Sequence, residues 1–287
     1  MDATSDDGLH GLSIIGFVGS VFSPYYARAR NKGKADPENH CAINIALYGK
    51  PRRWAMTERG ITRVARTAQQ FTVGPSSMMW NGNELTIDIH ERCVPLPFPL
   101  HGKVRLSAPA LYNAPVQLDD KGLHHWQAVA PQSRVTVEMD TPALKWSGPS
   151  YCDMNWGEEP LDRGFRQWTW ARANSSRGTE VIYSVERRDG SRFSFGRGFN
   201  AGNVVERSIP ENHALPRGFW GMTRTVMSEA PPRLIATLED SPFYTRNHIG
   251  LTLDGEQCEA YHESLSLDRF MNPVVQLMLP FRMPRFA

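Results

Sequence analysis

The sequence predicts an all-β protein built from short strands that close into barrels or sandwiches. Apolar and polar residues alternate with period two in several runs, which is the pattern of half-buried strands. The 287 residues include 23 glycines and 21 prolines, so turns are frequent. Aromatic residues make up 10% of the chain, and large rings favour β-structure around an apolar cavity over a helical bundle. Helical runs do not alternate with strands, so a doubly wound α/β fold is not predicted.

The alternation is clearest in the middle of each half of the chain. Leu85, Ile87 and Ile89 are separated by polar residues, and the same pattern recurs at 134–139 and 181–185. Trp168 and Trp170 also stand two residues apart. Hairpin turns are predicted at three dipeptides that tolerate positive φ, namely Asn81-Gly82, Asp189-Gly190 and Asp254-Gly255.

Two other segments invite a local prediction. Ile61, Val64, Ala65, Ala68 and Phe71 fall on one 3.6-residue face, which predicts a helix over 61–71. The glycine-containing stretch 16–26 is typical of a tightly packed barrel strand, with the wall of an apolar pocket as the functional alternative.

Length and charge bound the protein's class. At roughly 150 residues per domain, the chain predicts two β-domains, 1–150 and 151–287, with the boundary after Trp146–Pro149. A formal charge of +2 excludes a general electrostatic binder of nucleic acid. The acidic N-terminus does not resemble a signal peptide, and the uncharged stretch 11–27 is interrupted by Pro24. We therefore expect a soluble or peripheral protein.

Cofactor and metal motifs are missing from the sequence. The four cysteines form no C-x-x-C pair, so we expect buried reduced thiols. The sequence has no H-E-x-x-H spacing, nucleophile elbow or phosphate-binding glycine loop. We therefore predict no metal and no nucleotide cofactor. The cation-rich segment 28–34 suits either anionic lipid or a solvated loop, and the loop is the simpler interpretation.

Two short segments carry the candidate chemistry. On a strand, His124 and Trp126 would point to one face, and so would Tyr151, Asp153 and Asn155. Together they offer an acid, a base and aromatic faces to one cavity. A carboxyl group buried beside aromatic rings stays protonated more readily and can donate a proton. The alternative is an aspartate that caps a turn or pairs with Arg163.

Several longer motifs resemble one known family, carotenoid 1,2-hydratase, also called hydroxyneurosporene synthase. The similarity runs over most of the chain and is dense from about residue 5 to 195. The stretches that carry it are 16–26, 39–49, Met56–Gly60, Tyr151–Asn155, Glu159–Leu161 and Phe165–Trp170.

The resemblance implies a fold, a reaction and a set of site residues. The fold would be two tandem lipocalin-like (calycin) β-barrels with few short helices. The activity would be that of a hydro-lyase that adds water to the terminal C1–C2 double bond of acyclic carotenoids such as neurosporene and lycopene. It would need no cofactor. The catalytic candidates fall on His124, Trp126, Tyr151 and Asp153, with Asp153 central.

The substrate dissolves in lipid, so the resemblance also implies a cytoplasmic protein docked peripherally on the inner, photosynthetic membrane. The basic segment 28–34 and the apolar C-terminal segment 277–286 are the candidates for that docking. Other carotenoid-pathway enzymes are further candidate partners. Family members carry an aromatic segment before the position of Asp2, so part of a first strand is expected to be missing.

Other functions on such a scaffold stay open. A non-catalytic carrier of an apolar isoprenoid would need the same cavity but no protonatable aspartate. A cyclase guided by shape could use the same fold, because fold alone does not fix function. The preferred carotenoid, the number of ends hydrated and the oligomeric state are also open.

Overall fold

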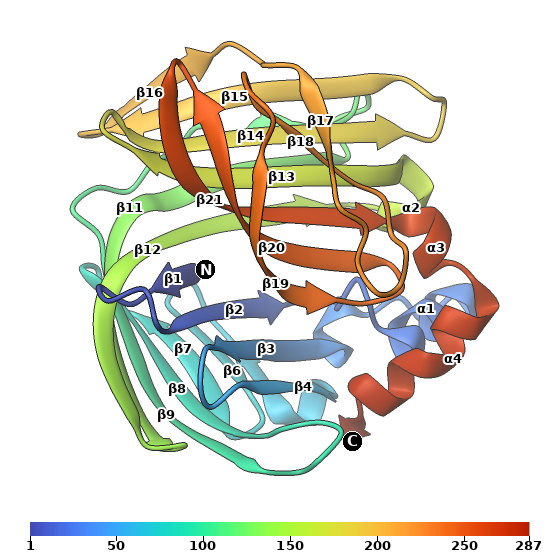
Figure 1. Ribbon diagram of the computed structural model, residues 1–287. Helices are drawn as coiled ribbons and strands as arrows, with labels where there is room; N and C mark the ends of the chain where they lie inside the picture. Colours follow the sequence, from blue (N-terminus) through green and yellow to red (C-terminus); the bar gives the residue numbers. More distant parts are fainter. Residues whose placement is uncertain (287) are drawn as a thin grey trace. The chain divides into compact units, whose positions relative to one another are not determined.

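The computed structural model describes residues 1–286, which form two compact units (Figure 1). The first unit contains Met1–Pro109, Gln132–Cys152 and Leu277–Ala287, and the second contains Ala110–Pro131 and Asp153–Gln276. Each unit is thus assembled from separated stretches of chain. The division into domains 1–150 and 151–287 stays a prediction.

The first unit is built on a 13-stranded sheet with strand order β22-β4-β3-β2-β1-β12-β11-β9-β8-β7-β6-β5, to which β10 adds a short pairing with β11. Neighbouring strands are antiparallel except at β22, which runs parallel to β4. The strands are β1 (Asp2–Thr4), β2 (Gly11–Phe17), β3 (Cys41–Tyr48), β4 (Arg53–Arg59), β5 (Val64–Arg66), β6 (Gln70–Val73), β7 (Ser76–Trp80), β8 (Glu84–Arg92), β9 (Pro99–Ser107), β11 (His124–Thr141), β12 (Leu144–Gly157) and β22 (Arg285–Phe286). The long strands β11 and β12 belong partly to each unit.

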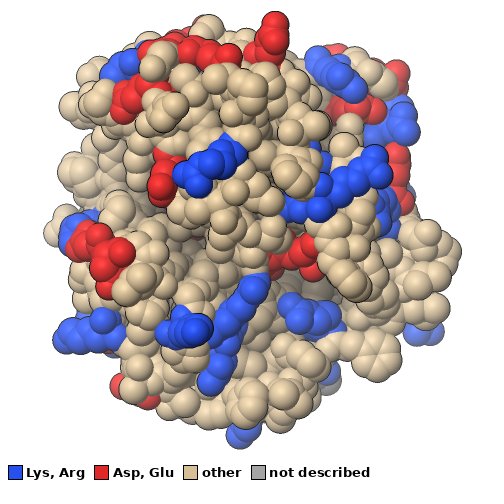
Figure 2. Space-filling model, viewed as in Figure 1, with Lys and Arg blue, Asp and Glu red and all other residues tan. Residues whose placement is uncertain are grey.

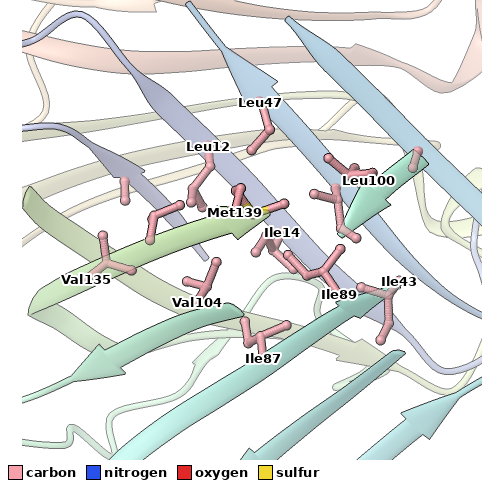
Figure 3. Packing of buried hydrophobic residues seen from close by; sticks show 14 of the residues in the cluster. Leu12, Ile14, Ile43, Leu47, Ile87, Ile89, Leu100, Val104, Val135 and Met139 are labelled. Carbon is pink, nitrogen blue, oxygen red and sulfur yellow. The ribbon is translucent and has the colours of Figure 1, made fainter. Parts of the chain in front are cut away.

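Period-two alternation supplies the core of this unit. Ile87 and Ile89 of β8 are fully buried, and Val135 of β11 faces the same core (Figure 3). Their polar neighbours along each strand are more exposed, since successive side chains point to opposite faces. The strand predictions at 85–89 and 134–139 are therefore confirmed.

The predicted helix over 61–71 is wrong. Ile61–Arg63 form one turn of 3₁₀ helix, and the chain then continues into strands β5 and β6, which pair with each other. Phe71 packs against the core from β6, which also pairs with β7. Sheet pairing has thus overridden a weak helical pattern that contains two threonines, Thr62 and Thr67, whose branched side chains suit strands.

The basic segment is not a simple loop. Helix α1 (Pro24–Asn31) includes Arg28 and Arg30, and only the residues after it are irregular. Its start is set locally, because the Ser23 hydroxyl accepts a hydrogen bond from the Tyr26 N–H at 2.9 Å and Pro24 occupies the first turn. The barrel strand predicted over 16–26 therefore ends at Phe17.

The second unit is built on a seven-stranded antiparallel sheet with order β16-β15-β14-β13-β21-β20-β19. The strands of this sheet are β13 (Phe165–Ser175), β14 (Gly178–Arg187), β15 (Arg192–Asn200), β16 (Asn203–Arg207), β19 (Arg233–Asp240), β20 (Tyr244–Leu253) and β21 (Glu256–Ser266). The unit also contains the separate hairpin of β17 (Asn212–Leu215) and β18 (Arg224–Met227), and the short strand β10 (Val116–Gln117), which pairs with β11. One face of the sheet buries Ala171, Ile182 and Ile249 against Leu215 and Val226 of the hairpin.

The predicted turns lie between strands. Asp254 and Gly255 form a two-residue connection between β20 and β21, and both have positive φ, 46° and 75°. Asn81-Gly82 and Asp189-Gly190 lie in slightly longer hairpin loops, with the glycine at positive φ in each. Local turn chemistry was thus a sound guide at all three places.

Helices are few and short, which confirms the all-β prediction. Besides α1, the helices are α2 (Leu161–Gly164), α3 (Leu267–Phe270) and α4 (Pro273–Arg282), with 3₁₀ turns at Pro37–Asn39 and Ile61–Arg63. In residues 1–286 none of the helices has the length and hydrophobicity needed to cross a bilayer. The four cysteines form no disulfide with one another; Cys41, Cys93 and Cys258 are buried, and Cys152 is half-buried.

Candidate active site

Trp126 and Asp153 meet on neighbouring strands. They lie on β11 and β12, which are adjacent in the sheet, and the Trp126 Nε1–H donates to Asp153 Oδ2 at 2.9 Å. The Trp126 side chain is fully buried, whereas Asp153 is half-buried. Asp153 stands inside a strand rather than in a turn. A carboxyl group is therefore held in place by an indole N–H.

Aromatic rings surround Trp126. Its ring centroid lies 5.3 Å from that of Phe195, 5.9 Å from that of Tyr183 and 6.5 Å from that of Phe199. Tyr183 and Phe195 are direct cross-strand partners on β14 and β15, and their rings stack at 5.5 Å with an 11° interplanar angle. The ring faces carry negative potential, so this wall suits a hydrocarbon and a developing cation.

Tyr183 joins this aromatic wall to two carboxylates. Burial raises the pKa of Tyr183, and the negative charges of Asp153 and Glu263 raise it further. The phenol therefore stays protonated and can donate a hydrogen bond. Glu263 lies two strands away in the same cross-strand row, because Trp170 pairs with both Tyr183 and Glu263. Glu263 is itself paired with Arg246, which is almost completely buried.

His124 occupies a separate, closed niche in the same unit. Its ring packs against Phe165 at 4.8 Å, and its Nε2 lies 3.5 Å from Glu159 Oε1. Gly157 and Gly164 leave room for it, since a Cβ at either position would come within 3 Å of a ring nitrogen. Burial lowers the pKa of His124, and the nearby Asp119 and Glu159 oppose that shift only in part. The imidazole is therefore mainly neutral near pH 7 and can accept a proton.

The four predicted site residues are thus distributed unevenly. The structure joins Trp126 to Asp153 by a hydrogen bond. None of the hydrogen bonds, ion pairs or ring contacts that His124 makes within residues 1–286 involves either of them. Tyr151 is buried on β12, opposite Asp2 of β1, and points to the same side of the strand as Asp153. It belongs to the first unit.

Sequence analysis alone did not select the residues that flank the pair. Tyr183 and Phe195 carried a usable signal, because aromatic residues recur two apart at Trp168–Trp170 and Phe193–Phe195, on the two strands that flank β14. Glu159 stands in one of the stretches that carry the family resemblance, but nothing marked its carboxylate as a partner of His124. Glu263 was not selected, since it is one acid among many.

Two further features of the second unit bear on ligand binding. A small pocket of this unit is lined by residues such as Glu180, Arg207 and Asp254 and does not include the Trp126–Asp153 pair. Across residues 1–286, no group of three or more His, Cys, Asp or Glu side chains is placed to hold a metal ion.

Comparison with known proteins identifies close relatives of the whole chain. The chain is 49% identical over 290 residues to the acyclic carotenoid 1,2-hydratase of Thiocapsa roseopersicina, covering 99% of this chain and 72% of that protein. It is 46% identical to the enzyme of the same name from Rubrivivax gelatinosus, covering all of this chain and 72% of the relative. The Cereibacter sphaeroides hydratase is 36% identical over 95% of this chain and 98% of its own length.

A solved structure and a family model complete the comparison. The crystal structure of CghA with Sch210972 superposes with a TM-score of 0.51 at 12% identity, covering 93% of this chain and 87% of that one. That likeness concerns the fold alone and agrees with the predicted tandem lipocalin-like architecture. The family model described as carotenoid hydratase CrtC matches residues 14–287. Because this family model and the two most similar of these relatives each match nearly the whole chain, the chain belongs to the carotenoid hydratase family.

Proposed function

We propose that this protein hydrates the terminal C1–C2 double bond of acyclic carotenoids such as neurosporene and lycopene, giving tertiary 1-hydroxy products without a cofactor. The observation that carries the proposal is the Trp126–Asp153 hydrogen bond beside a wall of aromatic rings. The names of the relatives, all acyclic carotenoid 1,2-hydratases, support the same reaction.

The first step is proton transfer to the alkene. Asp153, in its carboxylic acid form, donates its proton to C2, and the π electrons of the double bond form the new C–H bond. C1 becomes a tertiary carbocation and Asp153 becomes a carboxylate. The Trp126 N–H bonded to Oδ2 stabilises that carboxylate, which offsets the weak acidity of an apolar site. Tyr151, on the same side of β12, would be a second donor.

The second step is capture of the cation by water. The ring faces of Trp126 and Tyr183 stabilise positive charge at C1 until water attacks, by about 2 kcal/mol for a desolvated contact. The water oxygen forms the C1–O bond and releases one proton. We assign that proton to His124, since its imidazole is mainly neutral. Because His124 contacts neither Trp126 nor Asp153 within residues 1–286, the proton reaches it through intervening water. Return of a proton to Asp153 then restores the starting enzyme, and the sum is addition of one water.

The solubility of the substrate in lipid also indicates where in the cell the protein acts. We propose that the protein is cytoplasmic and works peripherally on the inner membrane, where one end of the carotenoid leaves the bilayer for the site. The relatives that support this proposal come from photosynthetic bacteria.

The test compares Asp153→Asn with Asp140→Asn, a matched control at an exposed residue. Asn keeps the shape of the carboxyl group and the acceptor for Trp126 but has no acidic proton. Hydration of lycopene in detergent, followed by mass spectrometry, should fall by at least about 100-fold in the first variant and stay normal in the control. Near-normal turnover by Asp153→Asn would refute the assignment. A wild-type protein that binds lycopene unchanged would be a carrier, and one that yields an isomer of equal mass would be a cyclase.

A further inference from the structure

Helix α4 is apolar on two sides. Val275, Leu279 and Met283, at the helix and just after it, are buried against the protein. A second stripe faces outward: Val274, Leu277, Met278 and Phe281, with Leu277 74% and Phe281 78% exposed. A surface helix normally places polar residues on its outer side, whereas this one has Gln276 and Arg282 as its only polar residues. An exposed apolar stripe of this kind marks an interaction surface.

The helix cannot rotate to bury that outer stripe. Just beyond it, Met283 packs in a cluster with Met56 and Ala42. The next turn of chain is fixed by charge, because Arg285 pairs with the fully buried Glu58, whose other partner is His40 at 2.7 Å. The outer stripe is therefore held outward by contacts on the opposite side.

The charged residues of α4 and α1 themselves are all basic. Residues 271–287 include no aspartate or glutamate. Helix α1 brings Arg28 and Arg30 to the far end of α4, because its Tyr26 stacks on His40 at 4.9 Å and His40 contacts Arg285. Lys32 and Lys34 follow on exposed chain. Figure 2 shows the surface over α4 as largely uncharged, with cationic side chains beside it. This pairing of apolar and cationic groups complements an anionic bilayer.

We propose that the outer stripe of α4 inserts into the headgroup layer of an anionic bilayer, while the cations of α1 bind lipid phosphates. The proposal rests on the proposed function, since a hydratase of membrane-dissolved carotenoids must reach its substrate at that surface. A second copy of the chain is the competing occupant of an apolar stripe. The cations favour lipid, because two copies would bring like charges together.

The experiment measures flotation of the full-length protein with vesicles of neutral phosphatidylcholine, with and without anionic phosphatidylglycerol. Deleting the tail would remove Met283 and Arg285, so substitutions are the sharper test. Leu277→Ser/Phe281→Ser should weaken vesicle binding by at least about 50-fold, since two large side chains lose their apolar burial. Leu9→Ser, at a 68% exposed leucine in the turn before β2, is the matched control and should bind normally.

The role of the α1 cations and the alternative of a second copy of the chain are tested by separate measurements. Arg28→Gln/Arg30→Gln should weaken binding to anionic vesicles by about 25-fold at low salt and have little effect on neutral vesicles. Vesicle binding by the α4 variant equal to wild type would overturn the proposal. A wild-type dimer that the α4 variant converts to a monomer in light scattering would do the same. Hydration in detergent, where docking is not required, should be unchanged in every variant, so failure of docking and failure of the proposed reaction are seen separately.

Discussion

Replacing Trp126 by Phe separates two roles that the structure gives to one side chain. The indole donates to Asp153 Oδ2 at 2.9 Å, and its ring packs 5.3 Å from Phe195 and 5.9 Å from Tyr183. Phe keeps an aromatic face at this position but cannot donate. Leu keeps part of the apolar volume and has neither property. The series Trp, Phe, Leu therefore removes first the donor and then the ring.

The expected magnitudes follow from these contacts. A hydrogen bond to a charged group contributes about 1.5–3 kcal/mol, and this one gains its full strength only after Asp153 has given up its proton. Trp126→Phe should therefore lower kcat by about 10- to 150-fold. Loss of the ring face in Trp126→Leu removes up to about 2 kcal/mol more of cation stabilisation, a further factor of about 30. Both costs belong to the transition state, so KM should change little.

Single-turnover hydration of lycopene in detergent, at saturating substrate, measures the chemical step. Trp146→Phe is the matched control. Trp146 is also a buried tryptophan, but it packs in the core of the first unit, and its Nε1 has no hydrogen-bond partner within the described chain. Thermal unfolding of both Phe variants shows whether the smaller ring alone destabilises the protein.

Two results would refute this reasoning. Single-turnover rates for Trp126→Phe within twofold of wild type would mean that the hydrogen bond to Asp153 does not act in the chemical step. Equal rates for the Phe and Leu variants would mean that the ring acts by volume and not by its π face.

Three further predictions concern charge and burial. Tyr183→Phe keeps the stack on Phe195 but removes the protonated hydroxyl near Asp153. Single-turnover rates should therefore fall about tenfold, while the affinity for lycopene stays unchanged. An unchanged rate would mean that Tyr183 takes no part in the chemical step. Arg285→Ala leaves the buried carboxylate of Glu58 without its strongest partner and should lower the free energy of unfolding by about 3 kcal/mol, measured by urea titration at pH 7. Burial lowers the pKa of His262 to about 4, below its unfolded value of about 6.5, so the unfolded state binds more protons. The free energy of unfolding should therefore fall by up to about 3 kcal/mol as the pH drops from 6.5 to 4. Urea titration at both pH values should show that His262→Gln loses this part of the pH dependence.

Much of the architecture was determined by the sequence alone, because its signals are local. Alternation at 85–89 and 134–139 fixes which side of a strand is buried, since successive side chains point to opposite faces. The dipeptide Asp254-Gly255 accepts the positive φ of a two-residue hairpin without help from distant residues. His124, Trp126, Tyr151 and Asp153 were selected on strand alternation and family resemblance, and the first three are buried.

The tertiary structure decided what depends on pairing between distant segments. Phe71 lies on a strand and not a helix because β6 pairs with β7 and packs Phe71 against the core. Tyr183 and Glu263 lie 30 and 110 residues beyond Asp153, and only the register of β13 with β14 and β21 places them in one row. The segment 274–283 is apolar except at Gln276 and Arg282, and its pattern did not tell which side would be covered. Packing decides that by burying Leu279 and Met283 and leaving Leu277 and Phe281 exposed, because a helix offers only one of its sides to the surface it packs on.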